Sequence, residues 1–160
     1  MTITFDTLTP IALHPAVVHF PIALLMVAAV FDSACLVLRR YLWLDRAATA
    51  LLIIGSVGLG AAYLTGLRAE KLAAPVTGAA QGVLAEHESL ALITLGGAGA
   101  ALLTKLLVTW LGRHDLRVQV GIFRLAALIL IYGTVFVLAL TAYHGGQLVF
   151  DHGVGVSLTG

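Results

Sequence analysis

The sequence has little charge and almost no cysteine. Only 11% of its 160 residues are charged, and the net charge is +1. No basic cluster interleaved with aromatic residues is present, which excludes the concentrated positive face that nucleic-acid binding requires. The single cysteine, Cys35, excludes an intramolecular disulfide and a Cys-x-x-Cys haem attachment motif. A nucleic-acid-binding protein and a c-type cytochrome are therefore not expected.

The motifs of common soluble enzymes are also missing. The chain has no Gly-x-Ser-x-Gly elbow, no Gly-rich phosphate loop with a lysine, and no His-Glu-x-x-His zinc helix. No internal repeat is convincing in the sequence, and no low-complexity tract occurs. Whether the chain is an enzyme stays open, and the only enzymatic role we expect is that of an electron-transfer or quinol-oxidising component.

Long apolar runs are what the sequence does contain. Its hydrophobic fraction is 60% and its mean hydropathy is +1.03, which indicates an integral membrane protein. A helix crosses the hydrocarbon core with about 20 residues, and four runs are long enough: 15–38, 47–67, 89–111 and 122–143. These runs lack the alternation of apolar and polar residues that is typical of a membrane β-barrel strand. We predict one all-α domain over residues 1–160, a bundle of four transmembrane helices in a lipid bilayer.

The basic residues predict how the bundle is oriented. Seven of the nine lie in or beside the two short links between runs: Arg39, Arg40, Arg46, Lys105, Arg113, Arg117 and Arg124. The positive-inside rule puts these links in the cytoplasm. Both termini and the long link 68–87 are then expected on the periplasmic side of a bacterial inner membrane. We read the first run as a retained span, and residues 145–156 as a tail folding back over the bundle. Link 68–87 is expected to be a lid, with a helix-like stretch at 79–86 leading into the third run.

Five of the six histidines lie at or just beyond the ends of these runs, on the expected periplasmic side: His14, His19, His87, His144 and His152. Imidazole binds haem iron, zinc, copper and non-haem iron, with its second nitrogen held by another group. Glu86, Glu88 and Asp151 are candidates for that role. The sequence therefore predicts a cofactor or metal site made from these histidines.

A b-type haem suits these histidines better than a bare ion. Haem needs two imidazoles on facing helices, whereas an ion needs three or four converging ligands. The five-residue step from His14 to His19 changes the depth by about 7.5 Å and the direction by about 140°, which disfavours convergence. We expect one or two haems, with His19 and either His87 or His144 as axial ligands, and His14 as a second ligand or a propionate or quinone contact.

Two alternatives stay open for the same residues. One is a copper, zinc or iron ion held by His14, His19, His87 and His144. The other is a structural membrane subunit without a cofactor, whose histidines cap helices at the interface. For Asp32, near the inner end of the first run, we expect a structural ion pair with Arg39, Arg40 or Arg124. His114 is expected to be solvated.

Three stretches resemble a known family. They are His-Pro-Ala-Val-Val-His-Phe-Pro-Ile-Ala-Leu-Leu from His14, Glu-His-Glu-Ser-Leu from Glu86, and Gly-Gly-Gln-Leu-Val-Phe-Asp-His-Gly-Val-Gly-Val from Gly145. Together they look like the bacterial four-helix membrane family called domain of unknown function 2231. By the family pattern, His14, His19, His87, His144 and His152 carry over. Phe150 stands where the family usually has tyrosine, which removes any role for a hydroxyl there.

The resemblance implies an electron-transfer setting, because relatives are fused to, or encoded with, Rieske-type or c-type cytochrome domains. This chain has no such domain, so the redox partner is expected to be a separate periplasmic or membrane protein, with quinone as a further candidate. A homo-oligomer or a larger complex is left open. Our expectation is a membrane b-type haem protein that transfers electrons near the periplasmic face.

Overall fold

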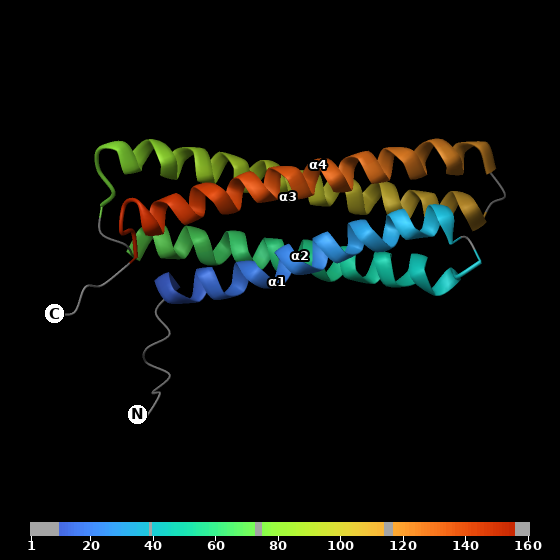
Figure 1. The fold of residues 1–160 in the computed structure, drawn as a ribbon, viewed down its shortest axis with the longest axis horizontal. Coiled ribbons are helices and arrows are strands. Elements are labelled where there is room, and N and C mark those ends of the chain that lie inside the picture. Colours follow the sequence, from blue (N-terminus) through green and yellow to red (C-terminus); the bar gives the residue numbers. More distant parts are fainter. Residues whose placement is uncertain (1–9, 39, 73–74, 114–116, 156–160) are drawn as a thin grey trace, which may run out of the picture.

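Four long helices make up the protein. The computed structural model describes residues 10–38, 40–72, 75–113 and 117–155. The helices, drawn in Figure 1, are α1 (Pro10–Val37), α2 (Leu42–Leu72), α3 (Ala79–Arg113) and α4 (Arg117–Phe150). Each is long and apolar enough to cross a membrane, and the part of the chain that the structure describes contains no strand. The prediction of an all-α protein with four membrane-spanning helices is confirmed.

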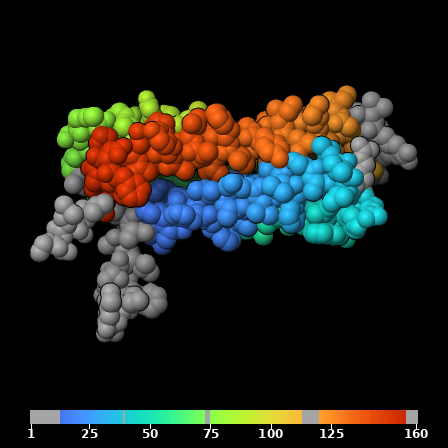
Figure 2. Space-filling view, viewed as in Figure 1, coloured from blue at the N-terminus to red at the C-terminus, as the bar shows by residue number. Residues whose placement is uncertain are grey.

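The helices are arranged as two hairpins. α1 packs along α2 and α3 packs along α4, whereas the contacts between the hairpins, α2 with α3 and α1 with α4, are fewer. Figure 2 shows α4 lying against α1 on one face of the molecule. α1 and α3 are diagonal to each other across the bundle. The start of α1 and the end of α4 lie at the same end of the molecule (Figure 1), which we call the histidine end because it holds His14, His87 and His144.

The helices extend beyond the apolar runs from which they were predicted. α2 continues to Leu72 and α3 already begins at Ala79, so the connection between them is short. The expected lid over 68–87 is wrong, since most of that segment forms the ends of these two helices. Charged residues such as Glu70 and Glu86 end the apolar run, yet glutamate is a good helix former.

The expected fold-back of residues 145–156 is also wrong for the part that is described. α4 continues through Gly145 and Gly146 to Phe150. It ends in a turn in which the Val154 amide donates to the Leu148 carbonyl at 2.8 Å. Gly153 has a φ of 65°, a left-handed conformation that glycine adopts easily and that commonly closes a helix in this way.

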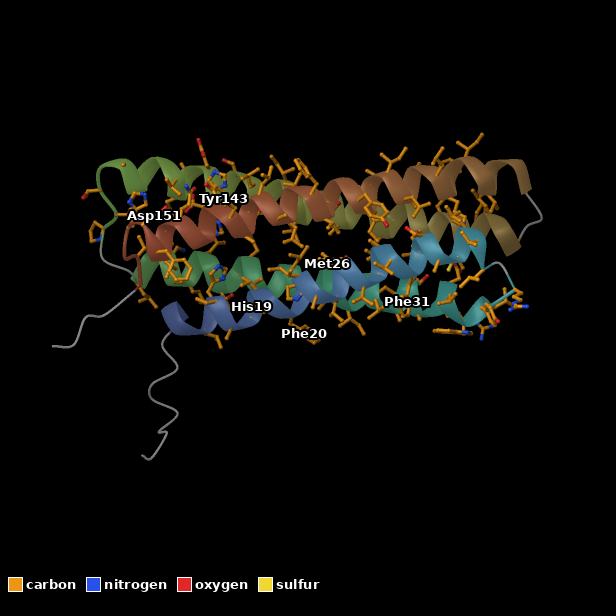
Figure 3. All side chains as sticks on the ribbon, viewed as in Figure 1. His19, Phe20, Met26, Phe31, Tyr143 and Asp151 are labelled. Carbon is orange, nitrogen blue, oxygen red and sulfur yellow. The ribbon has the colours of Figure 1, made fainter. Side chains whose placement is uncertain are left out.

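The core is a narrow stripe on each helix, and the other faces are apolar and exposed. Leu25, Ala28, Ala98 and Ala101 are at most 1% exposed. Phe20 and Met26, labelled in Figure 3, are 58% and 52% exposed on α1. Large apolar side chains on an outer surface suit helices surrounded by lipid. The interior is therefore small, and few polar side chains lie inside it.

Candidate functional site

His14, in the second turn of α1, lies against α2. Its Nδ1 is 3.0 Å from the carbonyl oxygen of Ala62 and 3.2 Å from Oγ1 of Thr65. The ring packs on Gly66, where a Cβ would lie 3.1 Å from Cε1 of His14. The missing side chain at residue 66 gives the imidazole room to approach the backbone of α2 closely.

His87, near the start of α3, makes the equivalent contacts with α4. Its Nδ1 is 2.9 Å from the carbonyl oxygen of Thr141. A Cβ at Gly145 would lie 3.1 Å from Cε1 of His87. Each hairpin therefore holds one imidazole by the same pair of features, a backbone carbonyl that accepts from Nδ1 and a glycine one turn further along the partner helix.

These hydrogen bonds assign a role to each ring nitrogen. A carbonyl oxygen can only accept, so Nδ1 of His14 and Nδ1 of His87 each carry the proton. In a neutral imidazole the other nitrogen, Nε2, then keeps its lone pair. A backbone carbonyl on the second nitrogen is also the usual support of a metal-binding histidine. Both rings are thus set up to offer Nε2 as a ligand.

The two imidazoles lie close together across the bundle. Their ring centroids are 6.4 Å apart and their planes are nearly perpendicular, at 85°. Two imidazoles on opposite sides of one metal ion have centroids about 6 Å apart, because each metal–nitrogen bond is about 2.0–2.1 Å long. The observed separation of the ring centroids is close to this value. His14 is on α1 and His87 is on α3, so the two rings face each other between the two hairpins.

The other three predicted site residues do not join this pair. His19 is exposed on α1 (Figure 3), and its Nδ1 donates to the Pro15 carbonyl of its own helix at 2.5 Å. His144 is partly buried, with Nδ1 bonded to the Leu140 carbonyl at 2.9 Å and Nε2 3.0 Å from Oε2 of Glu86. His152 is exposed in the turn after α4. The predicted axial role of His19 is therefore not supported by its position, and the facing pair is His14 with His87.

Glu86 was predicted as a partner for a histidine nitrogen, and the histidine it meets is His144. Both nitrogens of His144 are engaged, one by the Leu140 carbonyl and one by this carboxylate. His144 also stacks edge-on against Tyr143, with ring centroids 5.5 Å apart. Because neither nitrogen is free, this ring is a poor ligand in the observed arrangement.

A second polar cluster lies at the opposite end of the bundle, which we call the ion-pair end and define by Asp32, Asp45, Lys105 and Arg124. Lys105 Nζ contacts Oδ1 of Asp32 and lies 2.9 Å from Oδ1 of Asp45. Arg124 Nη2 lies 3.1 Å from the same Asp45 oxygen. The predicted ion pair of Asp32 exists, but its partner is Lys105 rather than Arg40 or Arg124. Arg39, the other candidate, lies outside the described residues. Sequence reasoning used Lys105 only to orient the bundle, although an ionisable residue inside an apolar run is itself a signal.

The ion-pair end also contains the one group of three metal-ligand side chains that we find among the described residues. Ligand atoms of Asp32, Cys35 and Asp45 lie within 4.8 Å of one another. Lys105 and Arg124 already neutralise these carboxylates, so a metal ion would have to displace the buried Lys105 and the partly exposed Arg124. We therefore assign this group to structure and keep the His14–His87 pair as the candidate site.

Comparison with known proteins places the chain in a family. No curated protein and no solved structure matches it significantly. A family model described as "Predicted membrane protein (DUF2231)" matches residues 10–158, which is nearly the whole chain. The match covers all four helices and both members of the histidine pair. The chain belongs to the DUF2231 family of predicted membrane proteins.

Proposed function

We propose that the protein holds one b-type haem between its hairpins, that His14 and His87 are the residues that would bind it, and that the protein transfers electrons at the histidine end. The observation that carries the proposal is the facing imidazole pair, with ring centroids 6.4 Å apart and each Nδ1 bonded to a backbone carbonyl. Haem, when bound, supplies one-electron chemistry at its iron. The role of the chain is to hold and orient the two ligands and to exclude water around them.

The number of ligands favours haem over a bare ion. A protein-bound zinc, copper or iron ion usually takes three or more protein ligands, whereas haem iron already has four nitrogens and needs only two. Among the residues whose placement is described, the histidine end brings together two free imidazole nitrogens and no third metal ligand. One haem is therefore the better fit, rather than the two that the histidine count allows.

The cellular setting follows from the charges. Arg40, Arg46 and Lys105 lie at or beside the end of the bundle opposite the histidines, together with other basic residues, and the positive-inside rule makes that end cytoplasmic. The haem would then lie near the periplasmic face of the bacterial inner membrane. Quinol is a suitable membrane donor, and a c-type or Rieske-type protein is a suitable acceptor, because both carry out one-electron chemistry of the kind that haem supplies.

A visible spectrum of the detergent-purified protein tests the proposal. We expect sharp α and Soret bands in the reduced-minus-oxidised spectrum and a positive pyridine haemochrome assay. His14→Ala and His87→Ala should each abolish the sharp bands, because each removes one axial ligand. His19→Ala and His152→Ala are matched controls, since both remove exposed imidazoles outside the pair, and both should keep the spectrum. Circular dichroism of each variant checks that the helices are intact.

Two results would overturn the haem proposal in different ways. Wild-type protein that is colourless after expression with ample haem, yet contains a stoichiometric metal, would indicate a copper, zinc or iron site at His14 and His87. Colourless protein without metal would indicate a structural subunit. Loss of the bands in His19→Ala but not in His14→Ala would keep haem and contradict the ligand pair.

A further inference from the structure

The two hairpins bury equivalent positions. Lys105 follows Asp32 by 73 residues, and the same offset relates five buried positions of α1 to five of α3. Pro21, Leu25, Ala28, Asp32 and Cys35 correspond in this way to Thr94, Ala98, Ala101, Lys105 and Val108, and all ten are buried. The repeated spacing of three or four residues is that of one helix face, so α1 and α3 present the same face to the interior.

α2 and α4 are related by a second constant offset. Arg124 follows Asp45 by 79 residues, and the buried residues Ala48, Leu52, Gly55, Leu59 and Ala62 correspond to Ala127, Ile131, Thr134, Leu138 and Thr141. The two histidines are related by the first offset, and the residues that they contact are related by the second. His14 bonds to Ala62 as His87 bonds to Thr141, and Gly66 supports one ring as Gly145 supports the other.

The equivalent charged positions have opposite sign. The first hairpin has carboxylates at 32 and 45, where the second has Lys105 and Arg124. The four meet in one cluster, with Lys105 on both aspartates and Arg124 on Asp45. Asp32 and Lys105 are 3% and 2% exposed, so neither charge is screened by water. Each charged side chain contacts the one at the equivalent position of the other hairpin, Asp32 with Lys105 and Asp45 with Arg124.

We infer that the chain is two copies of one helical hairpin, and that the exchanged charges make the first hairpin pair with the second rather than with its own kind. Two acidic hairpins would bring four carboxylates together, two of them buried, and two basic hairpins would do the same with four cations. Both arrangements leave charges uncompensated in a medium where an unpaired buried ion is strongly destabilising. This inference rests on the ion-pair end and does not depend on whether haem is bound.

Exchanging the charges within the full-length protein tests this inference. Asp32→Lys with Asp45→Arg makes all four positions basic, and Lys105→Asp with Arg124→Asp makes all four acidic. Each of these half exchanges should lower the apparent melting temperature in detergent by about 10 °C or more, or prevent accumulation of folded protein. The quadruple variant that combines all four changes exchanges the charges between the two hairpins. It should recover most of the loss, to within about 5 °C of the wild type, while leaving the net charge unchanged.

A second measurement separates pairing from overall stability. A protease site placed in the link between α2 and α3, at residues 73–78, allows the purified chain to be cut after folding, with a tag on one end. The two hairpins should stay together on a column in the wild type and in the quadruple variant, and separate in any half exchange that accumulates. Lys105→Arg with Arg124→Lys controls for side-chain shape and should behave as the wild type.

Three outcomes would overturn the inference. The first is a quadruple variant as unstable as the half exchanges, since equivalent positions must tolerate the exchange. The second is half-exchange hairpins that remain paired after cleavage as firmly as the wild type. The third is half exchanges with an unchanged melting temperature. Recovery in the quadruple variant alone supports the inference even where neither half exchange accumulates.

Discussion

The two ends of the bundle use the same framework in opposite ways. At the ion-pair end, side chains at equivalent positions of α1 and α3, Asp32 and Lys105, neutralise each other and are almost fully buried. At the histidine end, the equivalent His14 and His87 are only partly buried, and each bonds to its own hairpin and not to the other. Polar groups that satisfy each other hold hairpins together, whereas polar groups left with a free lone pair can bind a ligand.

The largest expected effect is at the ion-pair end. Lys105→Met keeps the length and apolar stem of the side chain but leaves Asp32 without its cation. Removing one partner of a buried pair costs about 3–5 kcal/mol, so thermal unfolding in detergent should occur at a much lower temperature. Lys71→Met is the matched control, because Lys71 is exposed at the end of α2, and it should change the free energy of unfolding by about 0.5 kcal/mol or less.

Lys105→Met also tests whether the two ends are independent. If haem binding in the variant, measured below its melting temperature, equals that of the wild type, the ion-pair end stabilises the bundle without tuning the ligand site. A variant that is fully stable would contradict the importance of the pair. A variant that is stable but cannot bind haem would instead show that the charges act on the histidine end.

The second prediction concerns the glycines that support the imidazoles. A Cβ at Gly66 or Gly145 would lie 3.1 Å from a histidine ring, whereas a Cβ at Gly146 would meet nothing within 4 Å. Gly66→Ala and Gly145→Ala should displace the rings by a few tenths of an ångström and weaken haem binding by about tenfold, as changes in the surroundings of metal ligands do. Absorbance titration of the apoprotein with haem measures this.

Gly146→Ala makes the comparison sharp. All three substitutions gain the helix-stabilising effect of alanine over glycine, about 0.5–1 kcal/mol. The three variants therefore share any change in helix stability, and only Gly66→Ala and Gly145→Ala also place a methyl group against a histidine ring. Haem affinity in Gly146→Ala should match the wild type. Equal weakening in Gly145→Ala and Gly146→Ala would mean that the contact with His87 does not matter for binding.

The sequence was enough to predict the number and type of the helices, because a 20-residue apolar run in lipid has few alternatives. It did not predict where they end. Hydropathy marks where charge begins, at residues such as Glu70 and Glu86, while helix formation continues through both. It also named His14 and His87 among five histidines without pairing them, since which rings face each other depends on how α1 and α3 lie across the bundle.

The relation between the hairpins was hidden for a different reason. Apart from His14 with His87 and Gly66 with Gly145, the equivalent positions that carry the same residue are alanine or leucine pairs such as Ala28 with Ala101 and Leu59 with Leu138. Apolar residues replace one another freely in a membrane core, and the charges are exchanged in sign, so identity is lost while burial and hydrogen bonding are kept. Lys105 was overlooked as a core residue because its charge was used only to orient the bundle, although an ionisable residue inside an apolar run is itself a signal of a buried position.

The smallest expected effects come from removing one hydroxyl at each end. Thr65→Val removes an oxygen that accepts from His14 at 3.2 Å, and Tyr132→Phe removes the partner of Ser33 Oγ at 2.7 Å, on the side of the ion-pair end. Each should lower the free energy of unfolding by about 0.5–1 kcal/mol. Because His14 keeps the Ala62 carbonyl at 3.0 Å, Thr65→Val should weaken haem binding only about two- to threefold, and Tyr132→Phe not at all. A larger change in haem binding from Tyr132→Phe than from Thr65→Val would mean that the ligand site extends toward the ion-pair end. The ion-pair end could then no longer be assigned to stability alone and the histidine end to ligand binding.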